Sequence, residues 1–170
     1  KNKKKITEND IIYKYLRKLN CNKSETFNFN NDGALIYSKK NKDLVVTNDS
    51  ISESIDFLKK DSAESIAQKI ITCNLSDLSA MGATPYAYTL SIFFPPGINK
   101  SWIERFTRKL FFLQKKYNIF LLGGDICKSN KILISANFFG HVDEKITIKR
   151  HFPNIDDSIW VTGNIGESYI

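Results

Sequence analysis

The stretch "NLSDLSAMGATP", residues 74–85, decides the fold, because a long amphipathic helix ends within it and the chain then turns into a strand. We expect Asp61 or Ser62 to cap the start of this helix, and Gly82 to end it near Met81. Pro85 prevents the helix from continuing. Apolar spacing predicts one buried face, made of Ala63, Ile66, Ala67, Ile70, Ile71, Asn74, Leu78 and Met81.

One carboxylate in this stretch does not suit an ordinary helix. At about 100° per residue, Asp77 is predicted to project between Ile66 and Ile70, inside the apolar face. A carboxylate taken out of water is unstable unless a positive or hydrogen-bonding group meets it. No Lys or Arg lies three or four residues away on the helix. We therefore expect a partner from another segment, or a hydrogen bond from Asn74 one turn earlier.

Helical and strand patterns alternate in the rest of the chain, hairpins included, which predicts an α+β fold with a mixed sheet packed by helices. The capping box formed by Ser101 and Glu104 predicts the start of a second long helix. A first helix is expected at residues 7–19, capped by Thr7 or Asn9. Strands are expected at residues 34–38, 44–47, 86–94, 118–125, 131–142 and from 158 onward.

Composition excludes several classes of protein. The net charge of +7 arises from 25 basic and 18 acidic residues in 170. The basic residues are dispersed and no nucleic-acid-binding signature is present, so no nucleic-acid partner is expected. The most apolar stretch, residues 90–98, is short and broken by two prolines, and no signal peptide is apparent, so no membrane partner is expected either. Three distant cysteines favour a reducing cytoplasm over a disulfide scaffold.

Four aspartates fall at or near predicted element ends beside small residues, where backbone and ligand can approach closely: Asp32, Asp49, Asp77 and Asp125. Carboxylates without a basic neighbour are typical of Mg²⁺ sites, which substrate phosphates usually complete. Zinc would need His or Cys clusters that the chain lacks. Asp32, Asp49 and Asp125 could instead each be a turn or cap residue. Spacing alone therefore indicates a metal site and no particular reaction.

Three motifs carry a family resemblance: "NLSDLSAMGATP", "GGD" at residues 123–125, and "IWVTGNIGES" at residues 159–168. From about Thr7 onward the chain resembles the thiamine-monophosphate kinases, in a superfamily with aminoimidazole ribonucleotide synthetase and selenophosphate synthetase. The resemblance implies a homodimer formed through the strands of an N-terminal domain, with ATP and Mg²⁺ bound in the cleft before a C-terminal domain. It places the N-terminal domain at residues 1–145, and the linker and beginning of a truncated C-terminal domain at residues 146–170.

The resemblance also implies the reaction and its residues. The γ-phosphoryl group of ATP would pass to thiamine monophosphate, giving thiamine diphosphate and ADP, and no protein nucleophile is needed. Two or more Mg²⁺ ions would be held by residues at six positions: Asp32, Thr47, Asn48, Asp49, Asp77 and Asp125. ATP would contact Gly124, Asp125 and Arg150, and the substrate would contact Asp56.

Three positions depart from the family pattern. Asn31 replaces an Asp, Asn48 stands where Thr is usual, and Asp56 stands where the family has a His. Asn31 and Asp56 keep open the alternative of a sibling ATP-dependent synthetase of the same superfamily. A further alternative is a non-catalytic nucleotide-binding dimerisation module. A Walker-type nucleotide site is excluded, because the chain contains no P-loop motif. The chain is expected to be a fragment with little kinase activity of its own.

Overall fold

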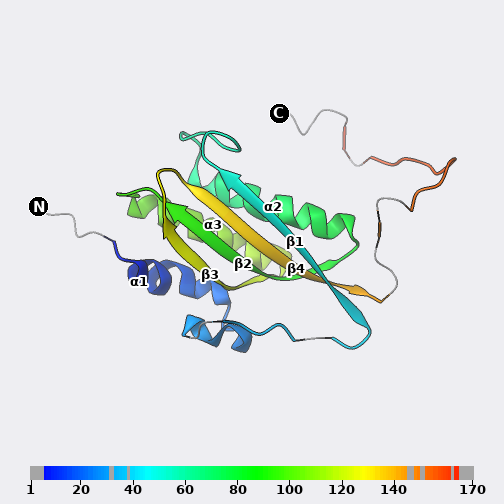
Figure 1. Ribbon diagram of the computed structural model, residues 1–170, viewed down its shortest axis with the longest axis horizontal. Helices are drawn as coiled ribbons and strands as arrows, with labels where there is room; N and C mark the ends of the chain where they lie inside the picture. Colours follow the sequence, from blue (N-terminus) through cyan, green and yellow to red (C-terminus); the bar gives the residue numbers. More distant parts are fainter. Residues whose placement is uncertain are drawn as a thin grey trace, which may run out of the picture.

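The computed structural model describes residues 6–30, 33–37, 39–144, 148–149, 152–161 and 163–164. The described part forms an α+β fold in which two long helices lie behind one four-stranded sheet (Figure 1). The predicted fold class and mixed sheet are confirmed. None of the helices in this described part combines the length and apolar character that crossing a membrane requires.

The sheet has the strand order β1-β4-β2-β3. Its strands are β1 (Lys42–Ser52), β2 (Thr84–Phe94), β3 (Phe120–Lys128) and β4 (Leu133–Asp143). Strand β4 pairs antiparallel with both β1 and β2, whereas β2 and β3 are parallel. The parallel pair needs a crossover, which a helix supplies. Strands β1 and β3 are therefore the two edges of this sheet.

The long helix predicted to end within residues 74–85 is confirmed as α2 (Ala63–Ala80). The side chain of Ser62 caps its start by accepting a hydrogen bond from the Ser65 backbone N–H, and Gly82 follows its end with φ +70°. Such a positive φ is readily adopted only by glycine, which explains the residue at this turn.

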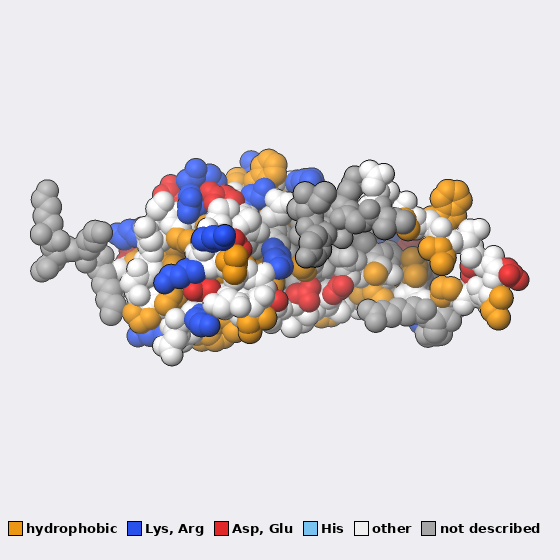
Figure 2. All heavy atoms as spheres, turned by 90° about the horizontal axis from the view of Figure 1, so that it is seen from above, with side chains coloured by type: hydrophobic (Ala, Val, Ile, Leu, Met, Phe, Trp, Pro, Cys, Tyr) orange, Lys and Arg blue, Asp and Glu red, His pale blue; other side chains and the backbone are white. Residues whose placement is uncertain are grey.

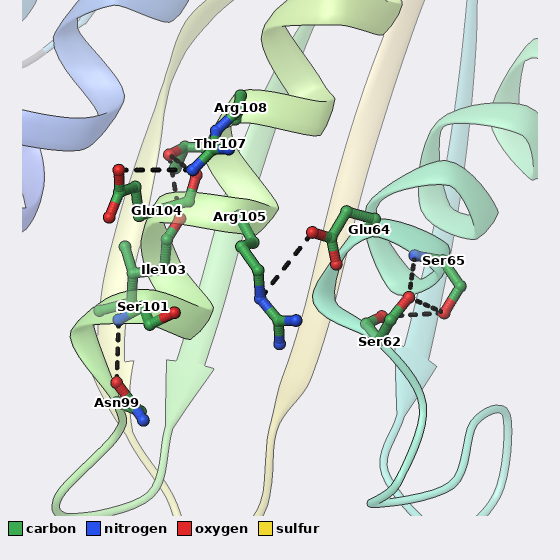
Figure 3. A network of polar contacts seen from close by, with 10 residues as sticks. All are labelled: Ser62, Glu64, Ser65, Asn99, Ser101, Ile103, Glu104, Arg105, Thr107 and Arg108. Carbon is green, nitrogen blue, oxygen red and sulfur yellow. Dashed lines mark hydrogen bonds and ion pairs between the residues drawn. The ribbon is translucent and has the colours of Figure 1, made fainter.

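The crossover helix α3 (Lys100–Tyr117) packs beside α2. Its cap is Asn99, whose side chain accepts from the Ser101 backbone N–H, so the predicted capping box at Ser101 is wrong by two residues. Asn99 is an equally good capping residue and its side-chain oxygen meets the first-turn N–H. An ion pair joins the two helices, with Arg105 Nε of α3 lying 3.8 Å from Glu64 Oε1 of α2 (Figure 3).

The main core lies between the sheet and these two helices. Residues with helical spacing on α2 and α3 meet the sheet face that carries Tyr88, Leu90, Ile92, Ile134 and Phe138, and all five side chains are buried. Because side chains alternate along a strand, the residues between these face the opposite side. That second face is apolar at one end, around Ala87, Phe120 and Leu122, and polar in its middle, as described below.

The N-terminal segment packs near the β3 edge. It is one helical run of α1 (Glu8–Ile11), π-helical η1 (Ile12–Leu16) and the 3-10 helix η2 (Arg17–Asn20), followed by η3 (Ser24–Phe29). Thr7 caps it in a reciprocal capping box with Asp10, as one of the two predicted caps. Contacts of η2 with β3 and α3 fix the run against the edge strand.

Two predicted strands are wrong. Residues 34–37 have no regular structure, and residue 38 lies outside the described residues. The strand expected from residue 158 is also absent over 158–161, where Ile159 and Trp160 are almost fully exposed. In both places apolar residues alternate as in a strand, but such a pattern shows only that a segment suits a sheet, and neither described segment pairs with one here.

Candidate functional site

A carboxylate pair lies where α2 faces β1. Thr47 and Asp49 are two residues apart on β1 and therefore project from the same face, toward α2. The Thr47 hydroxyl Oγ1 donates to Asp77 Oδ2 at 2.8 Å. The structure thus brings three of the predicted metal ligands, Thr47, Asp49 and Asp77, into one place.

Asp77 is exposed, so the expectation that it lies inside the apolar face is wrong. It lies on the side of α2 next to β1, an edge strand, and its side chain stays open to solvent. Asn74 is the buried polar residue of this helix, at 0% exposure, and its Nδ2 donates to the Ile70 carbonyl at 3.0 Å. Within the described residues no donor reaches Asn74 Oδ1. The partner of Asp77 comes from another segment, as expected, and is the Thr47 hydroxyl.

Burial and a neighbouring charge both act on the Asp49 carboxyl. Burial raises the pKa of the Asp49 carboxyl, and the negative charge of Asp77 raises that pKa further. A bound cation would remove both effects, because it neutralises charge and replaces lost water. The raised pKa of Asp49 therefore marks a place where a cation would bind favourably.

The next turns of α2 extend this site. Lys69, Cys73 and Asp77 are spaced by four residues, so they form one stripe along the helix. Burial raises the pKa of the Cys73 thiol, with smaller contributions from Asp49, Asp77 and Asp56, while Lys69 opposes them. The position of Lys69 was missed from sequence, although its spacing to Asp77 was a usable signal.

Asp56 lies in the turn after β1. Its Oδ2 accepts from the Ser52 backbone N–H at 2.8 Å and from the Ser52 hydroxyl at 3.3 Å. Its backbone carbonyl accepts from Lys69 Nζ. The carboxylate that the resemblance assigns to substrate is thus bonded to its own turn.

Two predicted ligands lie on the other face of the sheet. Asn48 Nδ2 donates to Asn137 Oδ1 at 2.9 Å and to the Ala136 carbonyl at 3.1 Å, away from Asp77. Asp125 lies inside strand β3 and not at its end, in register with Ser91 of β2. Its oxygens accept from the Ile126 backbone N–H at 2.8 Å and from Cys127 Sγ at 2.9 Å.

The sheet order separates Asp125 from the carboxylate pair. Asp49 lies on edge strand β1 and Asp125 on edge strand β3, on opposite faces. Three strand intervals of about 4.8 Å put their backbones roughly 14 Å apart. The expected convergence of Asp125 with Asp49 and Asp77 is therefore not found within one chain.

A cavity of about 480 Å³ lies beside Asp125, between β3, β2 and the N-terminal helical run. Its lining includes Gly33, Thr89, Gly124 and Asp125. A Cβ added to Gly124 would lie 1.9 Å from the Leu90 carbonyl oxygen, so only glycine lets the two strands approach this closely. The two predicted ATP-contacting residues that are described, Gly124 and Asp125, thus share one cavity wall.

Asp32 and Arg150 lie outside the described residues, as does Asn31. In the described part of the chain, no group of three or more His, Cys, Asp or Glu side chains is arranged to hold a metal ion. The pair Asp49 and Asp77 fits a hard cation by its oxygen chemistry, but it would need further ligands from water, substrate or other residues.

Seen from above, Asp and Glu side chains form a short row near the middle of the molecule, and Lys and Arg side chains gather over its left half (Figure 2). This surface carries both signs of charge.

Comparisons with known proteins place these features in context. A family model described as "AIR synthase related protein, N-terminal domain" matches residues 30–142. A thiamine-monophosphate kinase of Buchnera aphidicola subsp. Acyrthosiphon pisum is 39% identical over 166 residues, which cover 96% of this chain and 50% of that protein. The chain thus spans about half the length of the curated relatives it matches.

Solved structures agree with these matches. The crystal structure of a thiamine-monophosphate kinase from Stenotrophomonas maltophilia K279a is similar with a TM-score of 0.72 and 30% identity, over 82% of this chain and 44% of that one. A structure described as AaThiL complexed with AMPPCP and TMP is similar with a TM-score of 0.60 and 31% identity, over 66% of this chain and 36% of that one.

Proposed function

Because this chain belongs to the family of AIR synthase related proteins, we propose that it is the N-terminal part of an ATP-dependent thiamine-monophosphate kinase. The protein would transfer the γ-phosphoryl group of ATP to thiamine monophosphate. The single observation that carries the proposal is the contact of Thr47 with Asp77 beside Asp49. It supplies an acidic, oxygen-rich site in a chain whose relatives have this kinase activity in their names.

The chemistry of these residues suits phosphoryl transfer between two phosphates. Such a reaction brings several negative charges together, so it depends on positioning and on charge neutralisation. When bound, Mg²⁺ supplies that neutralisation. Asp49 and Asp77 would hold it, and the Thr47 hydroxyl orients Asp77 for this task. We propose two or more ions, with Asp32, Asn48 and Asp125 as further ligands.

The nucleotide would lie near Gly124 and Asp125. The lack of a side chain at Gly124 keeps β3 close to β2 and leaves backbone open at the wall of the 480 Å³ cavity. A phosphate can approach such a backbone closely. Arg150 would add a fixed cation toward the triphosphate. Asp56 is proposed to border the acceptor through its turn, since its carboxylate is bonded to Ser52.

The separation of Asp125 from Asp49 and Asp77 favours a site built by two copies of the chain. If all three serve one group of metal ions, Asp125 must come from a different copy, because one chain holds them on opposite sheet edges. We therefore propose a homodimer formed through the open sheet face. The exposed Leu44 and Val46 lie on that face of β1 and offer apolar surface for it.

The domain division at residues 1–145 and 146–170 remains part of this proposal, with the second segment leading into a C-terminal domain. The three cysteines are free, which supports a reducing, cytoplasmic compartment. ATP and thiamine monophosphate are the proposed small-molecule partners.

The test is a kinase assay of the protein at its native length with ATP, Mg²⁺ and thiamine monophosphate. We expect ADP and thiamine diphosphate in equal amounts, and a rate at least about a hundredfold lower in Asp77→Asn. Asp143→Asn is the control, because it removes the same charge from a surface pair with Lys42. Magnesium-dependent ATP binding without transfer would refute the kinase and favour a non-catalytic module. Turnover with a different acceptor would favour a sibling synthetase.

A further inference from the structure

We propose that Lys69 is an anion-binding residue of this site and contacts phosphoryl oxygens of a phosphomonoester acceptor. This inference rests on the proposed function and adds a binding residue on α2. It starts from the placement of Lys69, Cys73 and Asp77 in one helical stripe, with the carboxylate pair at one end and the turn that holds Asp56 at the other.

Charge balance at this corner favours an anion contact. Lys69 and Asp77 lie one helical turn on either side of Cys73. Asp77 bonds Thr47, which shares a strand face with Asp49, and Lys69 bonds the Asp56 carbonyl, so Lys69 lies at the same corner as these three acidic residues. Lys69 is the cation among them. Once metal ions neutralise Asp49 and Asp77, the Lys69 ammonium is free to attract an incoming phosphate.

The ammonium group also has donors to spare. It carries three N–H donors, and one of them bonds the Asp56 carbonyl. Among the residues that the structure describes, no carboxylate lies within ion-pair distance of Lys69. The contact with Asp56 anchors the end of a flexible side chain and leaves two donors for a ligand. A compact ammonium with free donors suits the small, highly charged phosphate of a monoester.

The turn does not need Lys69 to stay folded. Asp56 closes it through the two bonds from Ser52, and its own backbone N–H donates to the Ser52 carbonyl at 2.9 Å. The Ser54 N–H donates to the Phe57 carbonyl at 2.7 Å. These internal bonds hold the turn, so the Lys69 contact is better explained as positioning the ammonium than as supporting the backbone.

The experiment uses the protein at its native length with three variants. Lys69→Gln removes the charge, Lys69→Arg keeps it, and Lys116→Gln removes a matched charge from the exposed end of α3. In steady-state kinetics, Lys69→Gln should raise KM for thiamine monophosphate by about tenfold or more, with KM for ATP changed less than about twofold. Lys69→Arg should recover most of the affinity, and Lys116→Gln should behave as wild type.

A second readout needs no turnover. Inorganic phosphate is titrated by calorimetry into the protein with saturating Mg²⁺ and no nucleotide, with thermal unfolding measured in parallel. We expect Lys69→Gln to weaken phosphate binding by about tenfold while its Tm stays within a few degrees of wild type. Unchanged phosphate binding in Lys69→Gln, absent binding in wild type, or equal losses for ATP and acceptor would overturn the inference.

The two proposals fail separately. If wild type does not phosphorylate thiamine monophosphate but Lys69→Gln still loses phosphate binding, the kinase proposal falls and the Lys69 assignment stands. If wild type is an active kinase and Lys69→Gln keeps its KM and phosphate affinity, the Lys69 assignment falls alone.

Discussion

Replacing Gly124 with alanine should destabilise the sheet, whereas the same change at Gly123 should not. The new Cβ at Gly124 would lie 1.9 Å from the Leu90 carbonyl oxygen and 2.6 Å from its carbonyl carbon. Real Cβ atoms essentially never come closer than 3.0 Å to another heavy atom. The obstructing atoms are backbone of the paired strand β2, in register at Leu90, so no side chain can rotate away.

The magnitude follows from this overlap. Strand β3 would have to move from β2 by about an ångström, and overpacking of this kind costs roughly 1–3 kcal/mol. A weakened ladder hydrogen bond adds about 1 kcal/mol. We therefore expect the free energy of unfolding to fall by about 2–4 kcal/mol. At roughly 2–4 °C per kcal/mol for a chain of this size, Tm should fall on the order of 10 °C.

The assay is urea and thermal unfolding of both variants without nucleotide, so that a loss of ATP binding does not enter the result. Gly123→Ala is the matched control, because nothing lies within 4 Å of the Cβ it would gain. It should change the free energy of unfolding by less than about 1 kcal/mol. A Gly124→Ala protein as stable as wild type, or equal losses in both variants, would show that close strand approach at Gly124 is not the reason for glycine there.

Two further predictions concern titrating groups. The pKa of Asp49 is raised above its ordinary 3.8, chiefly by burial and then by the charge of Asp77, so the metal-free folded state loses stability as pH rises through 3.8 toward that raised pKa. Asp49→Asn should therefore raise Tm at pH 7 in EDTA but not at pH 3. With saturating Mg²⁺, the same variant should have a lower Tm than wild type. A Tm gain in EDTA that is equal at both pH values would contradict this. Burial and the hydrogen bond to Glu25 raise the pKa of Tyr86 to about 12, so its share of stability is intact below pH 10 and is lost between pH 10 and 12. Burial also raises the pKa of Tyr88, so absorbance titration near 295 nm should show more than one late tyrosine. The transition near pH 12 should be missing in Tyr86→Phe, and the idea fails if Tyr86→Phe removes a tyrosine that ionises near pH 10.

Much of the local structure could be predicted from the sequence. The helix that Ser62 caps and Gly82 ends is where its pattern placed it, because helical periodicity and capping depend only on residues a few positions apart. The motif at residues 74–85 indicated the family. Carboxylates beside small residues indicate a cation, and that assignment stays a prediction.

Strand pairing could not be predicted in this way. The strand expected at residues 34–38 is not formed over residues 34–37, and β1 pairs along its whole length with β4, so that Asn48 lies opposite Asn137. A strand pattern shows only that a segment suits a half-buried sheet, and the identity of its neighbour is decided by packing of the complete chain.

The exposure of the site residues also depended on the tertiary structure. By sequence alone, the chain determined an amphipathic helix with Asp77 near its end, an acidic residue set and a family. Only the folded sheet decided that Asp77 accepts a hydrogen bond from Thr47 on edge strand β1. It also decided that Asp125 lies on the other edge strand, β3, and on the opposite face of the sheet. The physical reason is that helix geometry is set by neighbours in sequence, whereas strand order and burial arise from contacts between segments many residues apart.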